Sequence, residues 1–217
     1  MTERDWPADV FDIQCRRCPR LARFLDEGRA DYPDYHLRPV PPFGERNARL
    51  LVVGLAPGYH GANATGRPFT GDHAGILLYR TLHRFGFASV ERSVSVDDGL
   101  TLHDCRITNA VKCVPPQNKP TTSEIHNCND FLAADLGLMP DGAVVIALGT
   151  VAHRAVLQGS GLRPAHAKFS HGAVHALPRD GTLIDSYHCS RYNTQTGRLT
   201  PAMFEAIFAR AASLLDR

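Results

Sequence analysis

Four short, nearly unbroken apolar runs constrain the fold of this chain more than any other feature. They cover residues 49–54, 106–111, 143–149 and, more weakly, 183–188. Strands that are apolar on both faces are typical of a parallel sheet covered by helices on both sides. The runs therefore predict four strands buried between two layers of helices.

Helical patterns alternate with these runs. Residues 76–85 carry apolar side chains on one side, and the segment from Pro201 onward shows the spacing of an amphipathic helix. Thr200 is the expected N-cap there, with the proline at the first helical position. Thr121 and Glu124 fit a capping box that opens a further helix, which should end near residue 136. The alternation predicts an α/β fold.

Composition sets the class of protein. The chain has 217 residues, 43% of them hydrophobic and 21% charged, which is enough apolar surface for a core and too little charge for disorder. It shows no internal repeat, no flexible linker and no apolar stretch near the ~18 residues of a membrane helix. We therefore expect one domain over residues 1–217, in a cytoplasmic monomer with no membrane contact.

Polar, glycine-rich segments follow three of the expected strands, at residues 54–75, 112–120 and 188–197. In open α/β sheets, ligands bind at the carboxyl ends of the strands. The chain contains no G-x-G-x-x-G or G-x-x-x-x-G-K motif, so a nucleotide-phosphate cradle is not supported. Phe69 lies in so polar a loop that no core is evident for it, which suggests stacking on a flat ligand.

Clustered cysteines suggest a metal centre. Cys15 and Cys18 form a C-x-x-C pair, and Cys113 and Cys128 lie farther along the chain. In a reducing cytosol, metal binding is a better explanation than a disulfide framework, and four thiolates suit either zinc or an iron–sulfur cluster. Free cysteines are also common as small buried side chains, and we assign that role to the remaining two, at positions 105 and 189.

The loops resemble those of the uracil-DNA glycosylase superfamily, specifically its family 5, the iron–sulfur type B enzymes. The matching strings are Gly54-Leu-Ala-Pro-Gly58, the stretch from Ile107 through Asn109 to Pro120, the stretch from Ser186 to Thr200, and the Cys15/Cys18 pair. They span nearly the whole chain in the expected order. The resemblance implies a single-domain, three-layer sandwich with a central four-stranded parallel sheet.

The resemblance also implies what each cysteine and loop residue does. It assigns Cys15, Cys18, Cys113 and Cys128 to a [4Fe–4S] cluster that is remote from the chemistry and structural. It assigns base binding to the residues of the first loop and the next strand end: Gly54, Leu55, Ala56, Pro57, Gly58, Phe69 and Asn109. Such an enzyme extrudes its base from the duplex. Without the resemblance, a turn-capping role would be the better interpretation of Asn109.

Three residues are the candidates for hydrolysis of the N-glycosidic bond. His188 would donate a hydrogen bond to the departing base, which gathers negative charge. Leu55 stands where many superfamily members carry a carboxylate or amide, so the resemblance suggests Asp72 for water activation or cation stabilisation. An aspartate there can equally be a helix N-cap. Asn193 is the second candidate for this role.

One loop departs from the family pattern. Family members commonly read His-Pro-Ser-Gln-Gln-Asn where this chain reads His188-Cys-Ser-Arg-Tyr-Asn193. We expect Arg191 and Tyr192 to fill the gap left by the extruded base and, with Arg198, to contact DNA. The expected function is release of uracil, and of other deaminated bases such as hypoxanthine or xanthine, from DNA.

Three alternative functions are compatible with the same sequence features. The first is a lesion-sensing DNA-binding protein that hydrolyses nothing, which would be favoured if Asp72, Asn109 and His188 failed to converge. The second is an iron–sulfur redox protein, and the third is a zinc-stabilised binding module. Iron analysis separates the zinc protein from the others.

Overall fold

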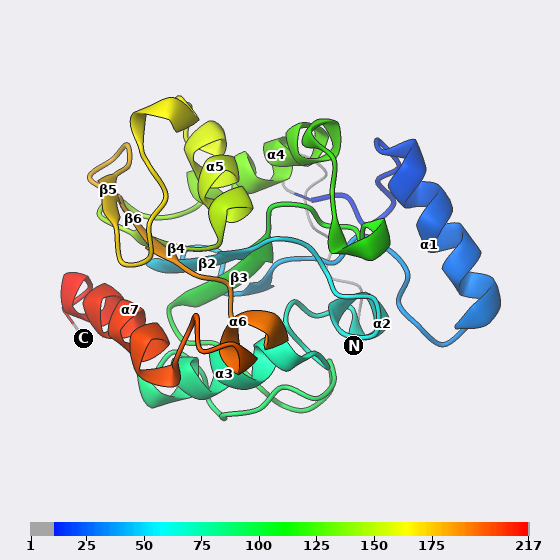
Figure 1. Cartoon of the computed structure of the whole chain (residues 1–217), viewed down its shortest axis with the longest axis horizontal. Coiled ribbons are helices and arrows are strands. Elements are labelled where there is room, and N and C mark those ends of the chain that lie inside the picture. The colour runs from blue at the N-terminus through cyan, green and yellow to red at the C-terminus, as the bar shows by residue number, and fades with distance from the viewer. Residues whose placement is uncertain (1–10, 217) are drawn as a thin grey trace.

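A six-stranded mixed sheet forms the centre of the computed structural model, which describes residues 11–216 (Figure 1). Four adjacent strands run parallel and coincide with the four apolar runs to within two residues at either end. They are, in spatial order, β3 (Cys105–Asn109), β2 (Leu50–Gly54), β4 (Val144–Leu148) and β6 (Thr182–Ser186). All but one of their residues are buried, which explains why the runs are nearly continuous.

The expected sheet of four parallel strands is not the whole sheet. Two short strands, β1 (Phe43–Gly44) and β5 (Val174–Ala176), pair antiparallel with its outer strands. With two and three residues, they are too short to show an alternating pattern in the sequence. The α/β class is confirmed, and the parallel four-stranded description is corrected to a mixed sheet.

Helices cover both faces of the sheet and make three layers (Figure 1). On one face, α3 (His73–Arg84) and α7 (Pro201–Leu214) pack on one side of the strands, and Leu50, Val52 and Ile146 belong to that core. On the other face lie two helices, whose core takes the alternate strand residues. These are α4 (Thr122–Gly137) and α5 (Thr150–Gly159).

Local sequence signals set two of these helices. Thr121 caps α4 by accepting a hydrogen bond from the main-chain N–H of Glu124, whose side chain accepts from the main-chain N–H of Thr121 in return. Thr200 caps α7 by accepting from the N–H of Met203. Both predicted N-caps are confirmed.

The remaining elements are short, apart from α1 (Pro19–Asp31) at one end of the molecule (Figure 1). Most of them lie in the loops around the carboxyl ends of the central strands. They are α2 (Ala62–Thr65), η1 (Pro116–Asn118), η2 (Pro164–His166) and α6 (Arg191–Gln195). Among the described residues, no helix has the length and apolar character needed to cross a membrane.

Candidate active site

A cavity of about 360 Å³ opens where the loops after β2, β3 and β6 meet. Its size falls within the range of small-molecule sites. It brings together Asp72, Asn109 and His188, whose convergence the sequence could only suggest. The full lining is Leu55, Ala56, Gly58, Ala62, Phe69, Asp72, Ala74, Asn109, Asn118, His188 and Ser190.

Gly54 allows two of these side chains to approach the end of β2. A Cβ at this position would lie 2.3 Å from Asn109 Oδ1 and 2.6 Å from the Cζ atom of Phe69. Neither approach is possible for a residue with a side chain unless those groups move. Gly54 is therefore required by the shape of the site, although it does not line the cavity itself. Pro57 is buried and does not line the cavity either.

Phe69 does have a core to join, contrary to the sequence argument. Its side chain is 5% exposed and belongs to the cluster beneath α3 and α7. Its backbone has a φ of 57°, in the left-handed region, and this turns the ring inward. The ring also stacks on His188, with centroids 6.0 Å apart and planes inclined by 27°. One part of Phe69 is thus core, and another part lines the cavity.

Asn109 is the last residue of β3 and is 3% exposed. Its main-chain oxygen accepts a hydrogen bond from Lys112 Nζ at 3.1 Å. Within the described part of the chain its side-chain amide has no hydrogen-bond partner, so the turn-capping interpretation does not hold. The amide is oriented and available to a ligand in the cavity.

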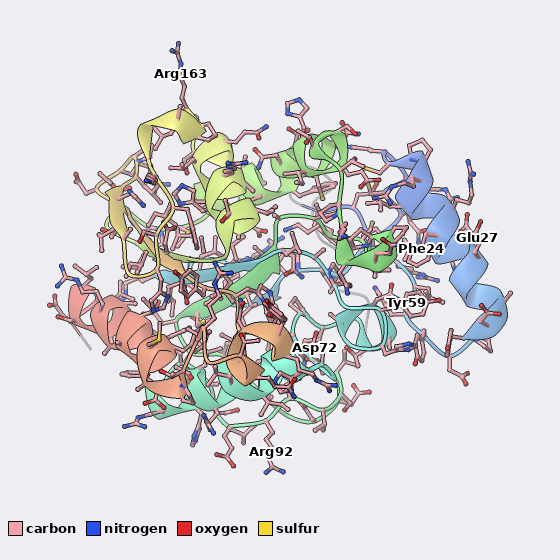
Figure 2. All side chains as sticks on the ribbon, in the orientation of Figure 1. Phe24, Glu27, Tyr59, Asp72, Arg92 and Arg163 are labelled. Atoms are coloured by element: carbon pink, nitrogen blue, oxygen red, sulfur yellow. The ribbon has the colours of Figure 1, made fainter. Side chains whose placement is uncertain are left out.

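Asp72 caps a helix and also lines the cavity. Its Oδ1 accepts from the N–H of Gly75 at 3.1 Å, which makes it the N-cap of α3. It also lines the cavity, and Figure 2 shows it beside α3 and α6. Burial raises the pKa of its carboxyl group, while hydrogen bonds from the N–H groups of Gly75 and Ala74 oppose the shift. Capping and a role in the cavity do not exclude each other.

His188 follows β6 and presents its ring to the cavity. Burial lowers the pKa of this imidazole to about 4, so the ring is neutral at pH 7. No hydrogen bond joins its ring nitrogens to any other described residue. Asn193 does not line the cavity, and instead its Nδ2 donates to the main-chain oxygen of His188 at 2.8 Å.

The short helix α6 projects two of the expected DNA contacts outward. Arg191 is exposed, and Tyr192 has 70% of its surface exposed. The guanidinium of Arg198 lies 4.7 Å from the centre of the Tyr187 ring. All three side chains belong to the segment that follows β6 and begins near His188.

Two polar lining residues escaped the sequence reasoning, as did the small apolar residues Ala62 and Ala74. Ser190 caps α6 by accepting from the N–H of Asn193, a Ser-x-x-Asn pattern that could have been recognised. Asn118 belongs to η1 and has a φ of 55°, a conformation that no local sequence motif predicts. Both add polar atoms to the rim of the cavity.

The four cysteines expected to bind a metal line one small cavity between α1 and α4: Cys15, Cys18, Cys113 and Cys128. Lys112 donates its main-chain N–H to Cys128 Sγ at 3.3 Å, and Asn127 donates to Cys18 Sγ at 3.8 Å. The remaining pair, Cys105 and Cys189, are buried in the core beneath α3 and α7. The division into four clustered and two core cysteines follows the sequence expectation.

Two of these sulfurs, those of Cys113 and Cys128, favour the protonated thiol form on their own. Burial and the neighbouring cysteines raise the pKa of Cys113, and burial raises that of Cys128 to about 11 although the Lys112 ammonium acts in the opposite direction. A cationic group among them would favour the thiolate forms. Four sulfurs around one cavity, two of them accepting N–H groups, therefore fit a group that takes four cysteine ligands.

A buried ionic network joins the cysteines to the main cavity. Asp135 is fully buried and accepts two hydrogen bonds from Arg106 and one, at 3.2 Å, from Lys112 Nζ. Lys112 Nζ also donates to Thr108 Oγ1 and to the oxygen of Asn109. Lys112 thus contacts both regions, through its main chain on one side and its ammonium on the other.

Comparison with known proteins gives consistent matches. The family described as the uracil DNA glycosylase superfamily matches residues 41–212. A type-5 uracil-DNA glycosylase of Thermus thermophilus is 47% identical over 92% of this chain and 93% of its own length. Proteins of the same name from Mycobacterium leprae (44% identical, 92% of this chain and 91% of the relative) and Pyrobaculum aerophilum (42%, 98% and 95%) are also similar.

Proposed function

The chain belongs to the uracil-DNA glycosylase superfamily, and from that premise we propose that it is a type-5 uracil-DNA glycosylase that begins base excision repair. The relatives of that name align with almost all of the chain. The observation that supports catalysis most directly is the meeting of Asp72, Asn109 and His188 in one cavity. Failure of these three residues to converge would have favoured the alternative of a lesion-sensing protein without activity.

The cavity receives a base that has left the duplex. A base inside the stack is out of reach, and extrusion costs a few kcal/mol, least where the base is mispaired. Phe69 supplies a ring against which the base stacks, and the amide of Asn109 can both donate to and accept from its polar edge. The apolar lining from Leu55 and Ala56 leaves those polar contacts to decide which base fits.

His188 stabilises the departing base. Cleavage of the N-glycosidic bond leaves the bonding electron pair on the base, whose oxygen gathers negative charge. A neutral imidazole donates one N–H, and the low pKa of His188 keeps it neutral across the working pH range. Phe69 stacked on its ring, and the Asn193 amide on its main-chain oxygen, hold it in place. Asn193 is therefore a positioning residue here rather than the group that activates water.

Asp72 supports the incoming water. Leu55 has no polar atom, whereas the carboxylate of Asp72 lies in the same lining and is held by the first turn of α3. As an anion, it stabilises the positive charge that develops on the sugar, and it accepts the proton that the water gives up as it adds to the sugar carbon. A raised pKa brings a carboxylate closer to the operating pH, which suits proton transfer.

The DNA surface is formed by α6 and the residues around it. Arg191 and Arg198 contribute positive charge for phosphates, and the exposed ring of Tyr192 can enter the gap left by the base. A formal charge of +2 for the whole chain means that such a local patch carries the attraction to DNA. We further propose that the protein acts as a monomer and one domain in the cytoplasm, with residues 1–10 outside the described structure.

Cys15, Cys18, Cys113 and Cys128 would hold a [4Fe–4S] cluster in this proposal. When bound, it supplies metal–thiolate bonds that cross-link the N-terminal segment, the loop after β3 and α4. Hydrolysis requires no electron transfer, so the cluster has a structural role. Iron and acid-labile sulfide near four of each per chain support this assignment, whereas stoichiometric zinc without iron contradicts it.

A single experiment tests the function. Duplexes carrying one uracil, hypoxanthine, xanthine or thymine are incubated with excess protein, and the released base is measured over time. We expect release of uracil, no release of thymine, and loss of release in Asp72→Ala. Tight binding of the uracil duplex without any base release would instead support the alternative function, a lesion-sensing protein without catalytic activity.

A further inference from the structure

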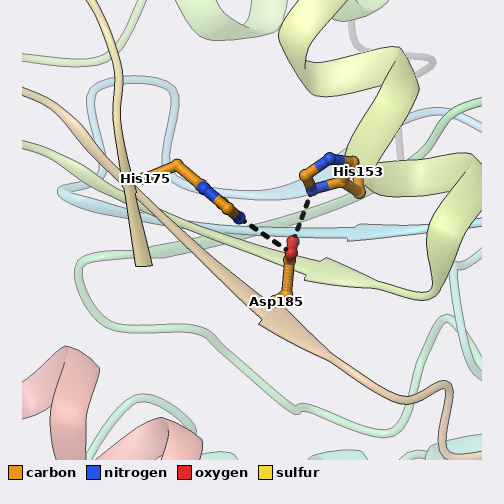
Figure 3. A group of neighbouring side chains, drawn as sticks. All are labelled: His153, His175 and Asp185. Atoms are coloured by element: carbon orange, nitrogen blue, oxygen red, sulfur yellow. Dashed lines mark hydrogen bonds and ion pairs between the residues drawn. The ribbon is translucent and has the colours of Figure 1, made fainter. Parts of the chain in front are cut away.

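Two histidines and an aspartate meet on the α5 side of the sheet, outside the active site and the cysteine cavity (Figure 3). His153 comes from α5, His175 from β5 and Asp185 from β6. Asp185 Oδ1 lies 2.7 Å from His153 Nδ1, and Asp185 Oδ2 lies 3.0 Å from His175 Nε2. One potential ligand atom from each residue falls within 4.8 Å of the others.

Asp185 needs a positive charge beside it. The residue has 0% exposure, and an isolated buried carboxylate is costly. Its side-chain partners are the two imidazoles and the main-chain N–H of Ser170 at 3.4 Å. Within residues 11–216, no lysine or arginine lies at ion-pair distance from it. A metal ion bound between the two imidazoles and the carboxylate would supply a compensating positive charge.

The hydrogen-bond partners of His153 also favour a bound cation. Its Nε2 lies 3.1 Å from the main-chain oxygen of Ala167, so both ring nitrogens of this 1% exposed residue face acceptors. A neutral imidazole has one N–H and can satisfy only one of them. The conflict disappears if Nδ1 binds a metal while Nε2–H donates to the carbonyl, which is the usual outer contact of a metal-bound histidine.

We propose that His153 Nδ1, His175 Nε2 and the Asp185 carboxylate bind one Zn²⁺ ion. Two imidazoles and a carboxylate are a ligand set that zinc accepts, with solvent as the fourth ligand. The side chain of His175 is 17% exposed and gives the ion and a water a way in. Ligand atoms about 2.0–2.1 Å from a tetrahedral zinc lie about 3.3 Å apart. The two distances between imidazole and carboxylate, 2.7 and 3.0 Å, are close to that separation.

The ion would act as a clamp. It would tie residues 167–175 to β6 only three positions before His188, and His171 Nδ1 in the same segment already accepts from the N–H of Tyr187. The site is therefore structural and separate from base excision. It does not depend on which bases the active site releases.

The test uses the purified, iron-loaded protein and ZnCl₂. We expect isothermal titration to show one zinc per chain, and anomalous scattering at the zinc edge to place it among His153, His175 and Asp185. His175→Ala should weaken binding by at least about 100-fold, since even outer-contact residues contribute 10–100-fold. His83→Ala, which removes an exposed histidine of α3, is the matched control and should bind as the unchanged chain does.

Iron content is measured before and after titration, so that zinc entering the cysteine cavity is recognised as such. Circular dichroism checks that His175→Ala is folded, and His175→Gln replaces it if it is not. Failure to bind zinc, or equal affinity in the chain with and without His175, overturns the proposal and leaves a hydrogen-bonded His–Asp–His cluster only.

Discussion

The active-site cavity and the cysteine cavity are neighbours along the chain, yet they are built in different ways. Asn109 and Cys113 are only four residues apart. The active site places Asn109 at the end of β3, in register with Gly54 of β2, so the sheet fixes its backbone. Of the four clustered cysteines, only Cys128 lies within a helix or strand. The first region is preorganised by main-chain hydrogen bonds, whereas the second would be held together by the proposed cluster through its side chains.

The largest expected effect comes from removing a side chain from the preorganised region. His188→Ala should slow single-turnover release of uracil by roughly 10²–10³-fold, because one oriented donor to a developing oxyanion is worth about 2.7–4 kcal/mol. Affinity for the uracil duplex should persist, because the DNA contacts on α6 are unchanged. Unchanged release by this variant would dismiss the proposed donor, and His83→Ala serves as the control.

The second change tests the shape of the same region. Gly54→Ala would place a Cβ 2.3 Å from Asn109 Oδ1 and 2.6 Å from Phe69 Cζ, so both side chains must move. A displacement of about 1 Å can cost roughly 10²-fold, and we expect a loss of that order in kcat/KM. Gly137→Ala in α4 has open space around the new Cβ and is the matched control. Equal losses in the two variants would contradict the steric argument.

The third change breaks the connection between the regions. Lys112→Met removes the ammonium that donates to Thr108 Oγ1 and to the oxygen of Asn109, and leaves Asp135 paired with Arg106 alone. Buried acceptors without a donor cost about 1–3 kcal/mol, so urea unfolding should show a loss of that size.

The charge of the Lys112 ammonium lowers the pKa of Cys128 and so favours its thiolate, whereas the main-chain N–H bond to that sulfur is kept in the variant. We therefore expect this variant to lose iron faster during incubation with a chelator. Lys168→Met changes an exposed lysine and controls for the substitution itself. A Lys112 variant that matches the unchanged chain in both unfolding and iron release would show that the two regions are independent.

The smallest expected effect concerns the pH profile of the unchanged chain, through the pKa of Asp72. Burial raises the pKa of its carboxyl group, so the protonated, inactive form should appear on acidification at a higher pH than for an ordinary aspartate. His188, with a pKa of about 4, stays neutral over most of that range. The profile of kcat/KM against pH should therefore show an acid limb at higher pH than an ordinary aspartate would give, and residual release by Asp72→Asn should lack it. A limb at the ordinary aspartate value would refute this.

The main strands were predictable because each is apolar on both faces and buried on both. The ends of β3 and β6 were the least accurate, each by two residues. Residues 110 and 111 look like strand, and their N–H groups do bond to the carbonyls of Gly54 and Leu55, but β3 ends at Asn109. The edge strands β1 and β5 were missed, because pairing with a neighbour defines them rather than any pattern of their own.

The candidate site was predictable only where a motif marks it. Asp72, Asn109 and His188 stand in recognisable strings, but nothing in the sequence shows that Phe69 has a positive φ that folds its ring into the core. The cluster of His153, His175 and Asp185 was missed altogether, since its members have no characteristic spacing and meet only because α5, β5 and β6 are neighbours.

The double role of Asp72 has an evolutionary consequence. Asparagine caps a helix about as well as aspartate does, so a single codon change could abolish the anion in the cavity while α3 keeps its first turn. A descendant that binds damaged DNA without releasing the base would then need no repacking of its interior. In this architecture, a repair enzyme could therefore become a protein that only binds damaged DNA through one substitution.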